Sequence, residues 1–416
     1  MLARIIIFCV LLLIDCYVFQ AVKSVCKNSS EKTKKSIYRI FGSVTIFISL
    51  VLLFTFILDY HSWNKAFREY VFAFIVIIYF SKIFVLPFLI IDDIIRFFRW
   101  MISFIRTKRN ISEIPIKRSH TISRSRFLSY AGITIAAIPF ASFICGMMGN
   151  AYNYKVKNVK LRFPKLPSSF NDLRIMQISD IHIGSFMSME PVKKAVQLIK
   201  EQKCDIIFFT GDLVNERTVE VTDFVEALKE IQAPMGVYSI FGNHDYGDYY
   251  EWQNKEAKKE NLEQLKNVHR DLGWRLLLNE NTTIEKNGEK INLIGVENWS
   301  AHNRFKKYGD LKKATSGMQD APFKILLSHD PSHWSAEVTE KYSDIDLTFS
   351  GHTHGMQFGV RIPNFQWSPV QYLYKHWLGL YQHKDQYLYV NPGLGFIGYP
   401  GRVGIMPEIT MFELQS

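Results

Sequence analysis

Histidine, aspartate and asparagine recur at short spacings in the C-terminal two-thirds of this 416-residue chain. They form five blocks, each directly after an apolar segment: Asp180-Ile181-His182, Gly211-Asp212, Gly242-Asn243-His244-Asp245, His329-Asp330 and Gly351-His352-Thr353-His354-Gly355. Imidazole, carboxylate and amide oxygen, without a thiol, are ligands for divalent metals such as Mn, Fe or Zn. The blocks therefore indicate a metal centre.

The number of ligands predicts two ions. A single zinc-like ion normally takes four ligands, and the blocks offer more. Two ions about 3.5–4 Å apart that share a carboxylate would use them all, as in phosphoryl-transfer sites. In an extended segment alternate side chains lie on one face, so we expect each Asp-x-His or His-x-His pair to hold one metal. Glycines beside the blocks permit tight turns that direct the ligands inward, at Gly211, Gly242, Gly351 and Gly355.

The elements that position these residues read as a layered α/β domain. Short apolar segments rich in β-branched residues indicate strands at 173–179, 205–210, 236–241, 291–296, 323–328, 345–349 and 387–390. Helical patterns separate several of them, for example at 190–202 and 219–231. We expect a linker and the first strand at 150–171 and one domain at 172–416. Ligands of open α/β sheets bind at the carboxyl ends of strands, where the blocks lie.

With the blocks in this order, residues 172–416 resemble the calcineurin-like metallophosphoesterase superfamily. The segments Asn391-Pro392-Gly393-Leu394-Gly395 and Pro407-Glu408-Ile409 are similar to those of its membrane-attached bacterial phosphodiesterase branch. That branch usually has Gly-Gly-Gln after His-x-His, whereas this chain has Gly355-Met356-Gln357, which puts the shape of the substrate cleft in question. The resemblance implies a β-sandwich flanked by helices.

The resemblance also implies a role for each residue of the blocks. Asp180, His182 and His354 would bind the first metal, Asp212 would bridge, and Asn243, His329 and His352 would bind the second. His244 would be the general acid that protonates the leaving group. From its position beside His244, Asp245 is interpreted either as a hydrogen-bond partner that keeps His244 protonated or as a turn or helix-cap residue. The implied activity is hydrolysis of phosphodiester or pyrophosphate bonds by metal-activated water, including those of lipid-linked or envelope substrates such as UDP-diacylglucosamine-like lipids. The alternative is a catalytically silent sensor or binding module on the same fold.

A cluster of basic residues in the C-terminal domain offers a second, weaker candidate site. Arg304, Lys306 and Lys307 lie in a short segment after Trp299 and are interpreted either as a phosphate or headgroup contact or as a solvated loop.

The N-terminal third predicts a membrane region at 1–149. Four apolar segments, about 5–22, 40–58, 71–91 and 127–148, approach the roughly 20 residues that cross a bilayer. Residues 1–126 carry 19 Lys/Arg against 7 Asp/Glu, and the remaining residues carry 31 against 32. The net charge of +11 therefore belongs to the membrane region. No basic face is left for the folded domain, which argues against nucleic-acid binding.

Basic residues in the short loops predict the orientation. The loop after the first span contains Lys23, Lys27, Lys32, Lys34 and Lys35, and the loop after the third contains Arg96, Arg99, Arg106, Lys108, Arg109, Lys117, Arg118, Arg124 and Arg126. If both loops are cytoplasmic, a multi-pass plasma-membrane protein has its catalytic domain outside the cytoplasm. The basic residues of 155–165 oppose this orientation.

Two ionisable residues, Asp15 and Lys82, lie within the predicted spans. In the predicted topology they fall at similar depth. An unpaired charge in hydrocarbon costs several kcal/mol. We therefore expect an ion pair between them, with a structural role.

Overall fold

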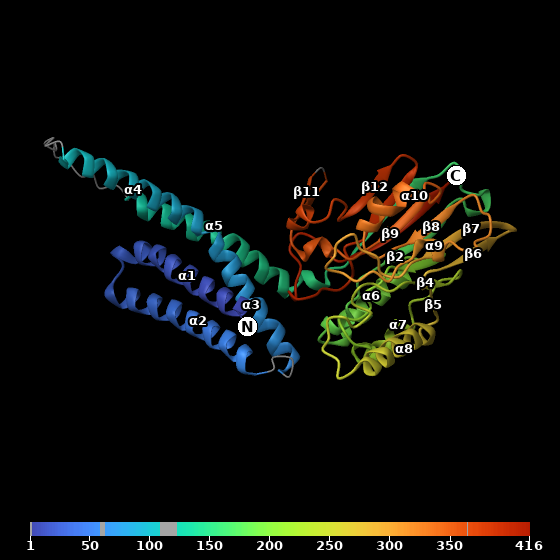
Figure 1. Ribbon diagram of the computed structural model, residues 1–416, viewed down its shortest axis with the longest axis horizontal. Helices are drawn as coiled ribbons and strands as arrows, with labels where there is room; N and C mark the ends of the chain where they lie inside the picture. The colour runs from blue at the N-terminus through green and yellow to red at the C-terminus, as the bar shows by residue number, and fades with distance from the viewer. Residues whose placement is uncertain (1, 59–62, 109–122, 364) are drawn as a thin grey trace. The chain divides into compact units, whose positions relative to one another are not determined.

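The computed structural model describes the chain except for residues 1, 59–62, 109–122 and 364. It consists of two compact units, Met1–Cys145 and Gly146–Ser416 (Figure 1). Arg109, Lys117 and Arg118, which belong to the basic loop predicted after the third span, lie outside the described residues.

The first unit is helical. Its helices are α1 (Leu2–Val25), α2 (Glu31–Ile57), α3 (Lys65–Ile83), α4 (Leu86–Lys108) and α5 (Arg124–Met148), the last of which runs into the second unit. Side-chain caps begin two of them: Ser30 accepts from Thr33 N, and Asn64 accepts from Phe67 N. Within the part of the chain that the structure describes, four stretches are long and apolar enough to cross a membrane: Ile5–Asn28, Glu31–Ile57, Ala66–Ile105 and Arg124–Met148.

The third predicted span differs from the structure. Where the sequence predicts one helix at 71–91 and then a loop, α3 ends at Ile83 and α4 continues to Lys108. Pro87 explains the break, because it lacks the N–H that a continuous helix needs but is tolerated in a first turn. Arg96 and Arg99 therefore lie on a helix, where Arg96 pairs with Asp92 and Asp93 of the same helix.

The predicted pairing of Asp15 with Lys82 is confirmed. The Lys82 ammonium group contacts the Asp15 carboxylate, which also accepts a hydrogen bond of 2.7 Å from Tyr79 Oη. Both side chains are largely buried among α1 and α3. Each charge thus has a partner within the helices.

The second unit contains two six-stranded sheets and a separate two-stranded sheet. The strand order is β1-β14-β2-β3-β4-β5 in one large sheet and β12-β13-β9-β8-β7-β6 in the other. Strands β2 to β5 are mutually parallel, as are β7, β8, β9 and β13. The bounds are β1 Lys155–Arg162, β2 Leu173–Ile178, β3 Ile206–Phe209, β4 Val237–Ser239, β5 Trp274–Leu276, β6 Glu280–Lys286, β7 Glu289–Gly295, β8 Lys324–Leu327, β9 Leu347–Ser350, β10 Val360–Ile362, β11 Phe365–Trp367, β12 Gly379–His383, β13 Gln386–Val390 and β14 Glu408–Gln415.

The main core lies between the two large sheets. In β3, Ile206 and Phe208 pack into this core, whereas Ile207 and Phe209 pack on the other face with the helices. This alternation has the period of two expected of a strand buried on both faces. Helices α6 (Met189–Glu201), α7 (Val225–Leu228) and α8 (Lys255–Asp271) lie along the first sheet, and α9 (Leu311–Ala314) and α10 (Thr339–Lys341) belong to the second (Figure 1). The predicted layered α/β fold is confirmed.

Candidate metal centre

The first two candidate ligands follow β2, but not in the conformation that the sequence predicts. Asp180 and His182 both have left-handed backbone conformations, with φ of 49° and 46°. His352 and His354 do the same, with φ of 73° and 51°. The expectation that strand alternation aligns each pair is therefore wrong. A non-glycine residue in the left-handed conformation reverses the chain locally and has an unfavourable conformational energy. Such strained residues are common at functional sites.

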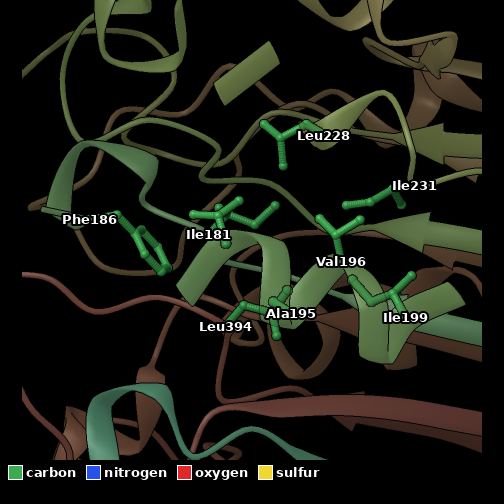
Figure 2. Close-up of a pocket in the computed structure, with 9 residues that line it drawn as sticks. Ile181, Phe186, Ala195, Val196, Ile199, Leu228, Ile231 and Leu394 are labelled. Atoms are coloured by element: carbon green, nitrogen blue, oxygen red, sulfur yellow. The ribbon is translucent and has the colours of Figure 1, made fainter. Parts of the chain in front are cut away.

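The residue between Asp180 and His182 is held by an apolar pocket. Ile181 is buried with Phe186, Val196 and Leu394 beneath α6 (Figure 2). The lining of this pocket is entirely apolar. It therefore holds the loop of Asp180 and His182 in place through Ile181, and it is not itself the metal centre.

Asp180, His182 and His354 form one triad. One ligand atom of each lies within 4.8 Å of the others, and all three side chains are buried. Asp180 Oδ1 lies 3.3 Å from His354 Nε2. The backbone N of His352 donates to both oxygens of Asp180, at 3.0 and 3.1 Å, and so orients this carboxylate.

Asp212, His329 and His352 form a second triad with the same limit of 4.8 Å. Asp212 Oδ2 lies 3.1 Å from His329 Nε2 and 3.5 Å from His182 Nε2. Asp212 therefore lies between the two triads. Asn243 lies beside the second triad, because its Oδ1 is 2.7 Å from His352 Nδ1. The structure thus brings all seven candidate ligands into one cluster.

Two glycines allow this approach. Gly211 has φ of +93°, and a Cβ atom there would lie 2.8 Å from Gly242 Cα. A Cβ atom on Gly242 would lie 2.7 Å from Asp212 Cγ and from His329 Cε1. No larger residue fits at either position unless the cluster opens.

The donor atoms of the cluster fit divalent cations. Among the described residues, His182 Nδ1 and Nε2, His329 Nε2 and His354 Nε2 are buried without a hydrogen-bond partner. Buried polar atoms are normally satisfied, so such orphans need another partner. Neutral imidazole nitrogens beside carboxylates are suitable ligands for a transition metal.

The electrostatics of the cluster agree. Burial lowers the pKa of His182 and lowers that of His352 to about 4, which keeps both neutral. Burial also opposes a charge on His329, but the Asp212 carboxylate raises the pKa of His329 to about 10. This ring therefore carries a proton at neutral pH, which a metal bound at His329 would have to displace. Although burial disfavours the charged carboxylate, the His354 imidazole holds the pKa of Asp180 below its usual range. The carboxylates therefore draw positive charge into the cluster.

His244 lies at the edge of the cluster. Its ring is 4.8 Å from that of His182, and it shares a third triad with His182 and Asp212. His244 Nδ1 donates a hydrogen bond of 2.7 Å to the carbonyl oxygen of Asn215, because a carbonyl oxygen can only accept. His244 Nε2 then remains free to exchange a proton with a ligand.

The predicted hydrogen bond from Asp245 to the His244 ring is wrong. The Asp245 carboxylate is buried and accepts four backbone N–H groups, from Asp212, Leu213, Val214 and Gly242, at 2.8 to 3.3 Å. Burial, with the nearby Asp212 charge, raises the pKa of Asp245 to about 7. Asp245 therefore anchors the loop that carries Asp212.

Three further residues support the cluster. Asp330 is buried, with Oδ2 3.4 Å from His352 Nε2, and Tyr374 Oη lies 2.8 Å from the same nitrogen. The Arg402 guanidinium is fully buried and lies 3.3 Å from His354 Nδ1. Asp330 directly follows the predicted ligand His329, so its place near the cluster could have been predicted from the sequence. Tyr374 and Arg402 belong to no local motif, so only the fold identifies them.

Two family models match the chain. Residues 2–151 match "Probable Calcineurin-like phosphoesterase, transmembrane domain", and residues 173–356 match "Calcineurin-like phosphoesterase".

Individual relatives agree with these models. A "Transmembrane protein with metallophosphoesterase domain" from Danio rerio is 30% identical over 66% of this chain and 60% of its own length. Two Bacillus subtilis metallophosphoesterases are similar: YkoQ is 28% identical over 68% of this chain and 98% of its own length, and YkuE is 32% identical over 60% and 82%. The chain therefore belongs to the calcineurin-like metallophosphoesterase family and is a membrane member of it.

Proposed function

We propose that the cluster holds two divalent ions and hydrolyses a phosphodiester or pyrophosphate bond. Asp180, His182 and His354 hold one ion, Asp212 bridges, and Asn243, His329 and His352 hold the second. The observation that carries the proposal is the pair of triads joined by Asp212, whose members are buried except for the partly buried His352. The imidazole and carboxylate donors suit Mn, Fe or Zn.

The chemistry divides between the ions and the chain. If bound there, two divalent ions would supply positive charge for the oxygens of a phosphoester and would lower the pKa of a water molecule. Asp180 and Asp212 supply the negative charge that retains the ions. With both ring nitrogens protonated, His244 would give the departing alkoxide the proton on Nε2 and keep the one that Nδ1 donates to Asn215.

The proposed substrate carries a second anionic group and is lipid-linked, as UDP-diacylglucosamine-like lipids are. The membrane helices of the same chain support the lipid part. Arg304 supports the anionic part. Its guanidinium lies 5.6 Å from the Phe305 ring, which is 4.8 Å from the ring of His352.

Arg304 is the cation of its loop that remains available to a substrate. Lys306 Nζ lies 2.6 Å from Asp248, and Lys307 Nζ lies 4.2 Å from the centre of the Trp299 ring. Arg304 has no ion pair or hydrogen bond within the described part of the chain and is exposed. It therefore has free donors for phosphate.

A substrate panel tests this function. Purified full-length protein with Mn²⁺ is given a soluble aryl phosphodiester, a phospholipid and a nucleotide-lipid pyrophosphate. We expect hydrolysis of diesters or pyrophosphates, and an increase in KM of at least about tenfold for the nucleotide lipid in Arg304→Gln. Lys307→Gln is the matched control and should leave KM unchanged. Activity only on soluble monoesters contradicts the proposed substrate class.

The second candidate is a metal-bound sensor that does not turn over. Metal content without hydrolysis of any member of the panel would favour it. The position of His244 beside the cluster favours the enzyme.

We further propose a plasma-membrane location with the catalytic unit outside the cytoplasm. The lysines near the α1–α2 turn support it, because short basic loops remain cytoplasmic. Protease treatment of intact cells tests it: the catalytic unit should be degraded while cytoplasmic proteins survive. Protection until the membrane is opened contradicts this orientation.

A further inference from the structure

Exposed apolar side chains of the second unit gather in one short stretch. Among its described residues, eleven large apolar side chains are exposed, and seven lie in the 25 residues from 356 to 380. These seven, here called the apolar surface, are Met356, Val360, Ile362, Phe365, Tyr372, Leu373 and Leu380. The other four are scattered along the chain. A cluster of this kind marks an interaction site, whereas isolated exposed residues do not.

Five of the seven residues lie on the β10–β11 hairpin and the turn that follows it: Val360, Ile362, Phe365, Tyr372 and Leu373. The β10–β11 hairpin is a separate two-stranded sheet, and its ends carry Ile362 and Phe365 (Figure 1). Trp367 Nε1 lies 3.5 Å from Tyr372 Oη, and Gln366 Nε2 lies 3.5 Å from the carbonyl oxygen of Leu378. The hairpin and the turn that follows it are therefore joined. A small core of Val370, Tyr374, Trp377, Leu378 and Ile405 lies beneath them.

The composition of this stretch suits an anionic bilayer. Residues 356–383 contain no Asp or Glu and include Lys375, which is exposed, and Arg361, which pairs with Glu408 at 2.6 Å. Lys375 is therefore the basic residue of this stretch that can reach a headgroup. Basic residues are attracted to anionic headgroups, and Trp and Tyr favour the membrane–water interface.

Covalent and local contacts tie this surface to the point where α5 ends. Six residues separate Met148 from the first residue of β1. Gly146, in the last turn of α5, accepts a hydrogen bond of 3.3 Å from Arg402 N. The next residue, Val403, bonds to Gln357 and Gly359 at 2.7 and 2.8 Å, directly before β10. The segment before β10 is thus connected, within the second unit, to the residues that directly follow the first unit along the chain.

The same surface is connected to the metal centre. Tyr374 Oη contacts His352, and Thr353 Oγ1 donates to the carbonyl oxygen of Trp377 at 2.6 Å. Ser368 Oγ donates to the carbonyl oxygen of Gly355 at 2.8 Å. The segment that carries the exposed apolar residues therefore also packs against the loop of candidate ligands.

We propose that the apolar surface inserts into the headgroup region of the phospholipid bilayer from which α5 emerges. It thereby holds the metal centre at the interface, where a phosphoester borne by a lipid is taken up. The second part rests on the proposed phosphoesterase function. The first part rests only on the surface itself.

Spin labels measure the insertion directly. The full-length protein, with its five free cysteines replaced, receives Phe365→Cys or the control Glu285→Cys on β6, at the far edge of the second large sheet. Each is labelled and reconstituted into vesicles of phosphatidylcholine and phosphatidylglycerol. We expect the label at 365 to collide more with oxygen than with a water-soluble nickel chelate, and the label at 285 to show the reverse. Equal behaviour of the two labels overturns the proposal.

A second copy of the chain is the competing occupant. Dipolar broadening between labels at 365 that disappears on dilution with unlabelled protein would show an interface between copies and overturn membrane insertion. Unbroadened spectra at both dilutions support insertion.

Activity tests the consequence. Ile362→Ser/Phe365→Ser should keep hydrolysis of a soluble aryl diester within about twofold but lose about tenfold or more on a phosphoester in vesicles. Val219→Ser, which changes an exposed apolar residue elsewhere, should alter neither. Equal loss on both substrates, or loss on neither, contradicts the proposal. If the unmodified protein cleaves no substrate, the proposed function fails, while the spin labels still decide the insertion.

Discussion

His244 is the residue whose role depends most on proton transfer. His244→Ala should retain the bound metals, because the seven candidate ligands remain. General acid catalysis contributes about 10²- to 10⁴-fold, so turnover should fall by that order for alkyl diesters with poor leaving groups. An activated aryl diester, whose leaving group needs no proton, should be affected far less.

The measurement is kcat for a series of diesters of increasing leaving-group pKa, with metal content determined on the same sample. A uniform loss across the series would remove the acid role from His244. Loss of metal would make it a ligand instead.

Asp245 predicts a stability effect of a different kind. Asp245→Asn replaces one acceptor oxygen by a donor, so buried N–H groups of the Asp212 loop lose their partner. An unsatisfied buried group costs about 1–3 kcal/mol. Thermal unfolding should therefore shift downward. The leaving-group dependence should keep its slope, and a changed slope would restore a catalytic role to this carboxylate.

Residue identities in the site were predictable, but their geometry was not. Asp180, His182, Asp212, His352 and His354 were recognisable from residue type and spacing. Their positive φ angles were not, because short-range sequence rules assign non-glycine residues to ordinary conformations. Arg402 escaped prediction because its contact with His354 joins residues 48 positions apart.

At the scale of elements, a buried histidine on α8 should make the stability of the fold depend on pH. His269, on α8, is fully buried beside Ser239, and burial lowers the pKa of His269 to about 3. The unfolded chain binds a proton near pH 6.5, whereas the folded chain does not until about pH 3. Stability is therefore complete above pH 6.5 and decreases as the pH falls.

At pH 5 the loss attributable to His269 is about 2 kcal/mol. Denaturant unfolding at pH 7 and pH 5 checks it, with His269→Phe as the comparison, because a residue that cannot ionise removes this part of the pH dependence. An identical pH dependence in both proteins would contradict the prediction.

The pair between α1 and α3 predicts coupling in the membrane unit. Asp15→Ala or Lys82→Ala leaves one charge buried without its partner, at a cost of about 3–5 kcal/mol, and the double variant should recover part of that loss. Thermal unfolding of the four proteins in detergent gives the coupling. Additive losses would show that the contact contributes nothing.

The helices show where sequence patterns stop being sufficient. Hydropathy located the four apolar stretches. It did not show that the third contains two helices, which are separated just before Pro87. The charges of α4 misled the prediction, because Asp92, Asp93 and Arg96 resemble a loop in composition. Arg96 pairs with both carboxylates within α4, while Arg124 of α5 pairs with Asp92 and Tyr17 of α1 donates to Asp93, and composition reveals none of these partners.

For the whole molecule, the sandwich explains how distant blocks reach one place. The parallel strands β2, β3 and β4 of one sheet and β8 and β9 of the other direct their carboxyl ends to the cluster. Strand order was not predictable from sequence, since β14 inserts between β1 and β2 from the far end of the chain. Convergence of the blocks was predictable, because each follows a strand.

The account depends on two cations being bound by this cluster. Elemental analysis of purified full-length protein, supplied with Mn²⁺, Fe²⁺ or Zn²⁺ and freed of unbound metal, should find about two divalent ions per chain. Asp212→Ala should bind one ion or none, because Asp212 joins both triads. One ion or fewer in the unmodified protein, or full metal content in Asp212→Ala, would contradict the dinuclear centre.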